Sequence, residues 1–183
     1  MDESFWVFGY GSLIWKPGFL PAERHIAHLP GYRRSFCMQS VTYRGSQHAP
    51  GLVLALQRDA TATCAGVALR VAPDGAKATL DYLRERELTY SGYQERHLPI
   101  TLADGRSPQA LAYVIDCTHP QFCGGLTLEN QAQIIARSRG EMGENSAYLF
   151  ETAQTLASLG LQDPDLSWLA QRVAELTGKP SNR

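Results

Sequence analysis

The pattern of hydrophobic and polar positions changes along this chain, from short apolar runs to helical periodicity. Apolar or alternating runs bounded by turn residues predict strands over residues 5–9, 35–41, 52–56, 64–71, 94–102 and 109–116. Residues 43–51 are rich in Gly, Ser and Pro and predict a loop. The last two strands flank Asp104-Gly105, which predicts a hairpin with an Asp-Gly turn.

Helical periodicity predicts helices over residues 75–90, 127–138, 145–159 and 164–177. Thr127 and Asn145 are expected N-caps, and Gly178 is an expected stop. Strands first and helices after indicate an α+β domain, with a closed or heavily curved sheet and helices packed outside it. The length and the lack of a repeat or linker predict a single domain over 1–183.

Composition and charge narrow the possible partners. The net charge is −1, which gives no electrostatic reason to expect nucleic acid or an anionic membrane as a partner. No apolar run approaches the roughly 20 residues of a membrane-spanning helix. The acidic start at Asp2 and Glu3 lacks the features of a secretory signal, so we expect a cytoplasmic protein.

The four cysteines do not form a metal-binding pattern. They are scattered without a CxxC pair, which is typical of reduced cytosolic thiols. Cys117, His119 and Cys123 could supply three ligands, but a fourth at ordinary spacing is missing. We expect no metal.

A glycine-rich loop follows the first strand. Gly9-Tyr10-Gly11-Ser12-Leu13 places two glycines where positive φ angles and the missing Cβ atoms would let N–H groups converge on an anion or a carbonyl oxygen. A dinucleotide-binding GxGxxG motif is excluded because position 14 is Ile14. Taken alone, the two spaced glycines favour an ordinary tight turn between strands.

The helix over 75–90 carries a carboxylate on its apolar stripe. Ala76, Leu80 and Leu83 are spaced by four and three residues, and Glu87 follows four residues later, whereas Glu85 lies well round the helix. Burial raises the pKa of a carboxyl group, as a general base near pH 7 requires. A structural ion pair with Arg34 or Arg96 would explain the same position, and the pattern leaves both open.

These residues resemble a known family. Val7-Phe8-Gly9-Tyr10-Gly11-Ser12-Leu13-Ile14-Trp15 is similar to the opening of the ChaC-like γ-glutamylcyclotransferases, the glutathione-specific branch of that fold. The resemblance continues through 30–36, 50–53, 82–87, 92–93, 110–114 and 143–149 and covers nearly the whole chain. One departure is Ser91, where many members carry a glycine.

The resemblance implies a fold, an activity and a site. The fold would be a γ-glutamylcyclotransferase-like small β-barrel with surrounding helices, and the reaction would cleave glutathione to 5-oxoproline and cysteinylglycine. The family's proton-handling glutamate falls on Glu87. Its substrate loop falls on Gly9, Tyr10, Gly11, Ser12, Leu13 and Ile14, with Tyr148 and Asn145 in a segment that could equally supply a packed aromatic ring and a helix cap.

The implied reaction is an intramolecular aminolysis that requires no metal, nucleotide or flavin. Glu87 would move the proton, and loop amides would hold either the γ-glutamyl carboxylate or the developing oxyanion. Two alternatives stay open: cyclisation of other γ-glutamyl amino acids or amines, and a non-catalytic module of the same fold that binds a small metabolite. Nothing in the sequence identifies protein partners.

Overall fold

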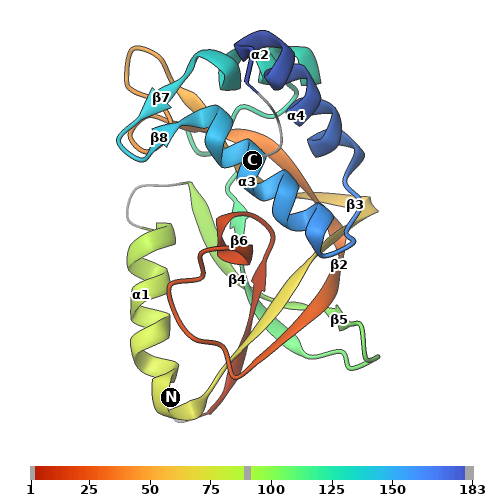
Figure 1. Ribbon diagram of the computed structural model, residues 1–183. Coiled ribbons are helices and arrows are strands. Elements are labelled where there is room, and N and C mark those ends of the chain that lie inside the picture. The colour runs from red at the N-terminus through yellow and green to blue at the C-terminus, as the bar shows by residue number, and fades with distance from the viewer. Residues whose placement is uncertain (1–2, 89–91, 180–183) are drawn as a thin grey trace. The chain divides into compact units, whose positions relative to one another are not determined.

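The computed structural model describes residues 3–88 and 92–179, and its contacts divide the chain into two compact units (Figure 1). The first unit comprises Met1–Ser35 and Ala55–Pro120, and the second comprises Phe36–Leu54 and Gln121–Arg183. Two long strands, β2 (Glu23–Ser40) and β3 (Gly51–Val71), contribute residues to both units. The single domain expected from the sequence stays a prediction.

The sheet of the first unit is mixed and strongly curled. β1 (Phe5–Gly9) pairs antiparallel with β3 and parallel with β6 (Gln109–Ile115). β3 also pairs with β6, at Leu56 and Val114, so each of these three strands contacts the other two. Because three mutually paired strands cannot lie flat, the sheet curls round on itself, as the expected α+β fold requires.

A hairpin extends this sheet. β4 (Tyr93–Pro99) pairs antiparallel with β6, and the short β5 (Thr101–Leu102) pairs with β2. The turn beyond β5 contains Gly105 with a φ of 91° and a hydrogen bond from its N–H to the Leu102 carbonyl. This confirms the predicted Asp-Gly turn.

The predicted strand boundaries in the middle of the chain are wrong. The runs 52–56 and 64–71 belong to one strand, β3, and β2 begins at Glu23 instead of residue 35. Arg58, Ala60 and Thr61, between the two apolar runs of β3, are exposed. Backbone pairing continues through such segments without burying side chains, so the apolar pattern does not reveal them.

Helix α1 (Ala76–Leu88) follows a short 3-10 turn, η2 (Pro73–Gly75), and lies beside β4 (Figure 1). Ala76, Leu80 and Leu83 are buried, as the stripe predicts, and Glu85 is exposed. The expected end of the helix at Tyr90 and the departure at Ser91 lie outside the described residues.

The second unit contains three helices and a small hairpin. The helices α2 (Leu128–Arg137), α3 (Asn145–Ser158) and α4 (Pro164–Thr177) contact one another, and the hairpin pairs β7 (Arg139–Gly140) with β8 (Gly143–Glu144). Apolar side chains from all three helices form their common core: Ala132, Ile135, Leu149, Leu156, Leu169 and Val173.

The helix ends follow local signals, with one correction. Thr127 caps α2 by accepting from Asn130 N–H, and Gly178 ends α4 in the left-handed conformation. Asn145 is not the N-cap of α3, because Glu144 occupies that position. The fully buried Asn145 side chain instead accepts from Leu52 N–H and donates to Leu52 C=O, each at 2.7 Å, and so completes the backbone pairing of β3.

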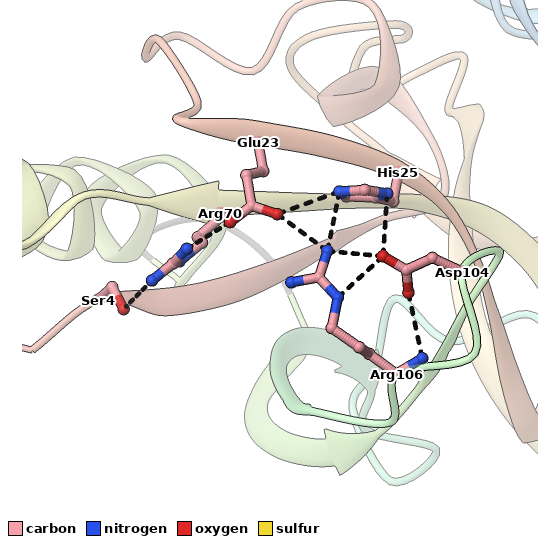
Figure 2. A network of polar contacts seen from close by, with 6 residues as sticks. All are labelled: Ser4, Glu23, His25, Arg70, Asp104 and Arg106. Carbon is pink, nitrogen blue, oxygen red and sulfur yellow. Dashed lines mark hydrogen bonds and ion pairs between the residues drawn. The ribbon is translucent and has the colours of Figure 1, made fainter.

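A charged network connects strands and turns of the first unit (Figure 2). Glu23 of β2 forms ion pairs with Arg70 of β3 and, at 2.9 Å, with Arg106 of the turn before β6. His25 lies between the Glu23 and Asp104 carboxylates, and Arg106 also contacts Asp104 at 2.7 Å. These contacts join three segments that are distant in sequence.

Among the described residues, no helix combines the length and the apolar character needed to cross a membrane.

Candidate active site

The candidate catalytic carboxylate lies at the end of α1. Glu87 is partly buried, with 14% of its side chain exposed, one turn beyond the fully buried Leu83. Its Oε1 lies 3.1 Å from Nε of Arg86. Of the two arginines considered from the sequence, Arg34 donates to the carbonyls of Tyr10 and Ala65, and Arg96 donates to the Gln94 side chain. An ion pair of either with Glu87 stays a hypothesis.

Two opposing effects act on the Glu87 carboxyl group. Burial raises its pKa above the ordinary value of a glutamate, and the weaker effect of the Arg86 charge lowers it. Tyr113 of β6 is close enough that the Glu87 charge helps to raise the pKa of its hydroxyl, together with burial and the charge of Glu95. A carboxyl group with a raised pKa exchanges protons closer to neutral pH.

The glycine loop connects β1 to a single 3-10 turn, η1 (Ser12–Ile14). Neither Gly9 nor Gly11 has a positive φ, so that part of the prediction is wrong; Gly11 has φ −134°. The missing Cβ matters at Gly9, because one there would press on the Leu13 side chain and the Ile14 nitrogen. Gly9 therefore permits a close approach of Leu13 and the Ile14 backbone, and neither glycine supplies a left-handed turn.

The loop side chains divide into buried and accessible groups. Tyr10, Leu13 and Ile14 are buried, and the Tyr10 hydroxyl donates to the Tyr113 carbonyl at 2.9 Å. Ser12 is half-buried. The first N–H groups of a helix have no acceptor within it, so the Ser12 and Leu13 amides have none inside η1. Binding of a substrate through this backbone and the Ser12 hydroxyl stays a prediction.

Arg86 joins the loop to the carboxylate. One guanidinium nitrogen, Nη2, donates to the Ser12 hydroxyl at 2.8 Å, while Nε faces Glu87. The role of this side chain was not predicted from the sequence, where its position next to Glu87 was the available signal. Arg34 was assigned no role in the loop either; it is buried and holds the Tyr10 carbonyl at 2.8 Å.

Tyr148 lies in α3, in the second unit. Its buried ring packs edge-on against Phe36, with centroids 5.9 Å apart, and the Arg44 guanidinium lies 5.5 Å from its centroid. These contacts account for a packed aromatic residue. A contribution of Tyr148 to the substrate site stays a prediction.

Cysteine and histidine side chains do not gather into a ligand set in the described part of the chain. There, no group of three or more His, Cys, Asp or Glu side chains is arranged to hold a metal ion. No disulfide is formed, and burial raises the pKa of the Cys123 thiol to about 11. The groups of the candidate site described above are the Glu87 carboxyl group, the Arg86 guanidinium, the Ser12 hydroxyl and the loop backbone.

The fold and the candidate site together define a class of protein. The sheet is curled and mixed, and its glycine loop is joined through Arg86 to the partly buried Glu87. The family model for ChaC-like proteins matches residues 5–176. The chain therefore belongs to the ChaC-like family.

Named relatives agree with this assignment. The glutathione-specific gamma-glutamylcyclotransferase of Escherichia coli is 35% identical over 171 residues, covering 93% of this chain and 73% of that protein. The protein of the same name from Schizosaccharomyces pombe is 35% identical over 182 residues, covering 90% and 89%.

Solved structures support the fold. The selenomethionine-labelled crystal structure of the yeast γ-glutamyl cyclotransferase specific to glutathione matches with a TM-score of 0.85 at 24% identity, covering 94% of this chain and 96% of that one. A γ-glutamyl cyclotransferase structure matches with a TM-score of 0.57 at 15% identity, covering 94% and 88%. The curled α+β architecture is therefore that of the γ-glutamyl cyclotransferases.

Proposed function

We propose that this protein is a glutathione-specific γ-glutamylcyclotransferase, a lyase that converts glutathione to 5-oxoproline and cysteinylglycine. The observation that carries the proposal is the partly buried Glu87, joined through Arg86 to the glycine loop, in a chain of the ChaC-like family. The names of the curated relatives from bacteria, yeast and animals support glutathione as the substrate.

The proposed reaction conserves all atoms of the substrate. The α-amino nitrogen of the γ-glutamyl residue forms a bond to its own side-chain carbonyl carbon, and the bond from that carbon to the cysteine nitrogen breaks. Counted from the neutral amine, one proton moves from the attacking nitrogen to the leaving nitrogen, and no water is consumed. Because both reacting groups belong to one molecule, folding the substrate into a near-attack geometry is a large part of the task.

Glu87 is assigned the proton transfer. The attacking amine is an ammonium at pH 7, so it must lose one proton before it attacks and a second as the ring closes. The departing nitrogen gains one proton as the C–N bond breaks, and the free amine takes up another from solution. A carboxyl group whose pKa is raised by burial can accept the first proton and return it to the leaving cysteinylglycine. These bond changes require no metal, nucleotide or flavin.

The loop is assigned the binding role. The amides of residues 11–13 would hold the γ-glutamyl carboxylate or the oxyanion that develops on the attacked carbonyl. Ser12 adds a hydroxyl whose oxygen accepts from Arg86. Tyr10, Leu13 and Ile14 contribute by fixing the loop in the core, and Tyr148 is retained as a predicted contact of the substrate.

The proposed location is the cytosol, where glutathione keeps thiols reduced. Nucleic acid and membranes are not expected partners for a chain with a net charge of −1.

The deciding experiment is turnover of glutathione by the purified protein, with release of cysteinylglycine and 5-oxoproline measured together. Glu87→Gln should fold normally and lose roughly 10²–10⁴-fold in kcat, the usual contribution of general-base help. Glu85→Gln is the matched control, because Glu85 is exposed on the same helix. Near-wild-type turnover by Glu87→Gln would show that the proton is carried by another group.

The alternatives give different results in the same assay. Faster release of 5-oxoproline from γ-glutamyl-alanine than from glutathione would indicate a cyclotransferase for other γ-glutamyl donors. Binding of glutathione without release of either product would indicate a non-catalytic module.

A further inference from the structure

The Arg86 guanidinium contacts both parts of the candidate site. Nη1 donates to the backbone carbonyls of Lys16 (2.7 Å) and Pro17 (3.4 Å) and to the Tyr82 hydroxyl of the same helix (3.0 Å). Nη2 donates to the Ser12 hydroxyl (2.8 Å), and Nε lies 3.1 Å from Glu87 Oε1. Only 21% of the side chain is exposed.

From these contacts we infer that Arg86 is a positioning residue, which fixes the loop of residues 12–18 and the Glu87 carboxylate in one arrangement for catalysis. The inference rests on the proposed function and deepens it. Arg86 is assigned no contact with the substrate and no share in the bonds that change.

The geometry of arginine suits this role better than that of lysine. A guanidinium is planar, stays charged, and carries five N–H donors in a fixed fork, so one side chain can bind several acceptors at set angles. Here the fork connects residues 74 positions apart in sequence, Ser12 and Arg86. A lysine could keep the charge beside Glu87 but could not reproduce the same set of angles.

A second side chain of α1 holds the same loop. Gly18 has a φ of 82°, and a Cβ at this position would overlap the Tyr82 hydroxyl, so the backbone there lies directly against that ring. Tyr82 is one helical turn before Arg86, and its hydroxyl accepts from Arg86 Nη1. Arg86 and Tyr82 of α1 therefore both contact the backbone of residues 16–18, and they also bind each other.

The charge of Arg86 also acts on the proton-transfer group. It lowers the pKa of Glu87 against the larger opposite effect of burial. Tyr113 of β6 and, through it, Glu95 of β4 also act on this carboxylate from packed elements. Removing the Arg86 charge leaves burial and these groups in place, so Glu87 should keep its proton to a higher pH.

The test compares Arg86→Gln and Arg86→Lys with the wild type, using kcat, KM and the pH profile of glutathione turnover. Arg86→Gln should lower kcat/KM roughly 10–100-fold, because small misplacements of catalytic groups cost about this much. Its acid limb should also move to higher pH. Arg86→Lys should restore the position of the acid limb but not the rate. Lys77→Gln is the control, since Lys77 forms an exposed pair with Asp81 on the same helix.

Hydrogen–deuterium exchange supplies a readout that does not depend on turnover. Amides of residues 9–18 should exchange faster in Arg86→Gln than in the wild type or Lys77→Gln. Unchanged loop exchange, or a wild-type rate and pH profile in Arg86→Gln, would overturn the inference. If the wild type releases no cysteinylglycine, the proposed function fails, and the exchange result alone decides the role of Arg86 in holding the loop.

Discussion

At the scale of single residues, the ionised Glu87 carboxylate that the proposed proton transfer needs lowers the stability of the folded chain. Burial favours its protonated form, so the folded chain binds this proton more tightly than the unfolded chain does. At neutral pH the ionised carboxylate must be kept in surroundings that disfavour its charge, and Arg86 offsets only part of that cost. Residues with this combination are frequent at active sites.

This cost predicts that Glu87→Gln is at least as stable as the wild type at neutral pH. A raised pKa makes stability fall as pH rises from the ordinary value of 4.5 through the raised one, and glutamine lacks this titration. We expect the difference in Tm between variant and wild type to grow from pH 4 to pH 8. A gain of about 1 kcal/mol would raise Tm by roughly 2–4 °C.

Thermal unfolding followed by circular dichroism measures this difference, with Glu85→Gln as the exposed control. A variant less stable than the wild type at every pH would instead mean that Glu87 is held by a structural ion pair.

At the scale of elements, a buried amide joins helix α3 to strand β3. Asn145 satisfies both backbone groups of Leu52, at 2.7 Å each, and is itself fully buried. Such a side chain acts as an extra strand residue, because it offers one acceptor and one donor with the spacing of a backbone pair.

Asn145→Ala should therefore be strongly destabilising. It leaves the Leu52 N–H and C=O without these partners, at about 1–3 kcal/mol for each group, or about 2–6 kcal/mol together. Urea unfolding of the variant measures the loss. Asn130→Ala is the control, because Asn130 is exposed on α2 and should change stability by less than about 0.5 kcal/mol. A loss that small in Asn145→Ala would show that Leu52 is satisfied without the amide.

Elements whose boundaries are set by neighbouring residues could be predicted from the sequence. The α1 stripe and the end of α4 at Gly178 depend on neighbouring residues, so local patterns suffice to locate them. The full length of β3 depends on backbone pairing with its neighbouring strands, and such pairing leaves no apolar pattern in the exposed middle of the strand. The role of Asn145 was misassigned because asparagine before a helix is usually a cap.

At the scale of the whole chain, the groups given roles in proton transfer and loop positioning belong to the first unit. The glycine loop lies more than 70 positions before Arg86 and Glu87 in the sequence. Local patterns located the loop and Glu87 but not Arg86. The link between them was not predictable, because it depends on where the curled sheet brings the end of β1 relative to α1. Family membership supplied the substrate class, which neither the periodicity nor the charge pattern contained.

The charged network around Glu23 predicts how the first unit responds to acid. Arg70 and Arg106 hold the pKa of Glu23 at about 2, well below its ordinary value of 4.5. A lowered pKa gives stability that is present above pH 4.5 and is lost as pH falls toward 2.

Tm of the wild type should therefore fall between pH 4.5 and pH 2. Glu23→Gln has no such proton to bind, so its Tm should fall less. Glu141→Gln, at an exposed position, should follow the wild type. Equal slopes for wild type and Glu23→Gln would mean that the network of Figure 2 contributes nothing to folding in solution.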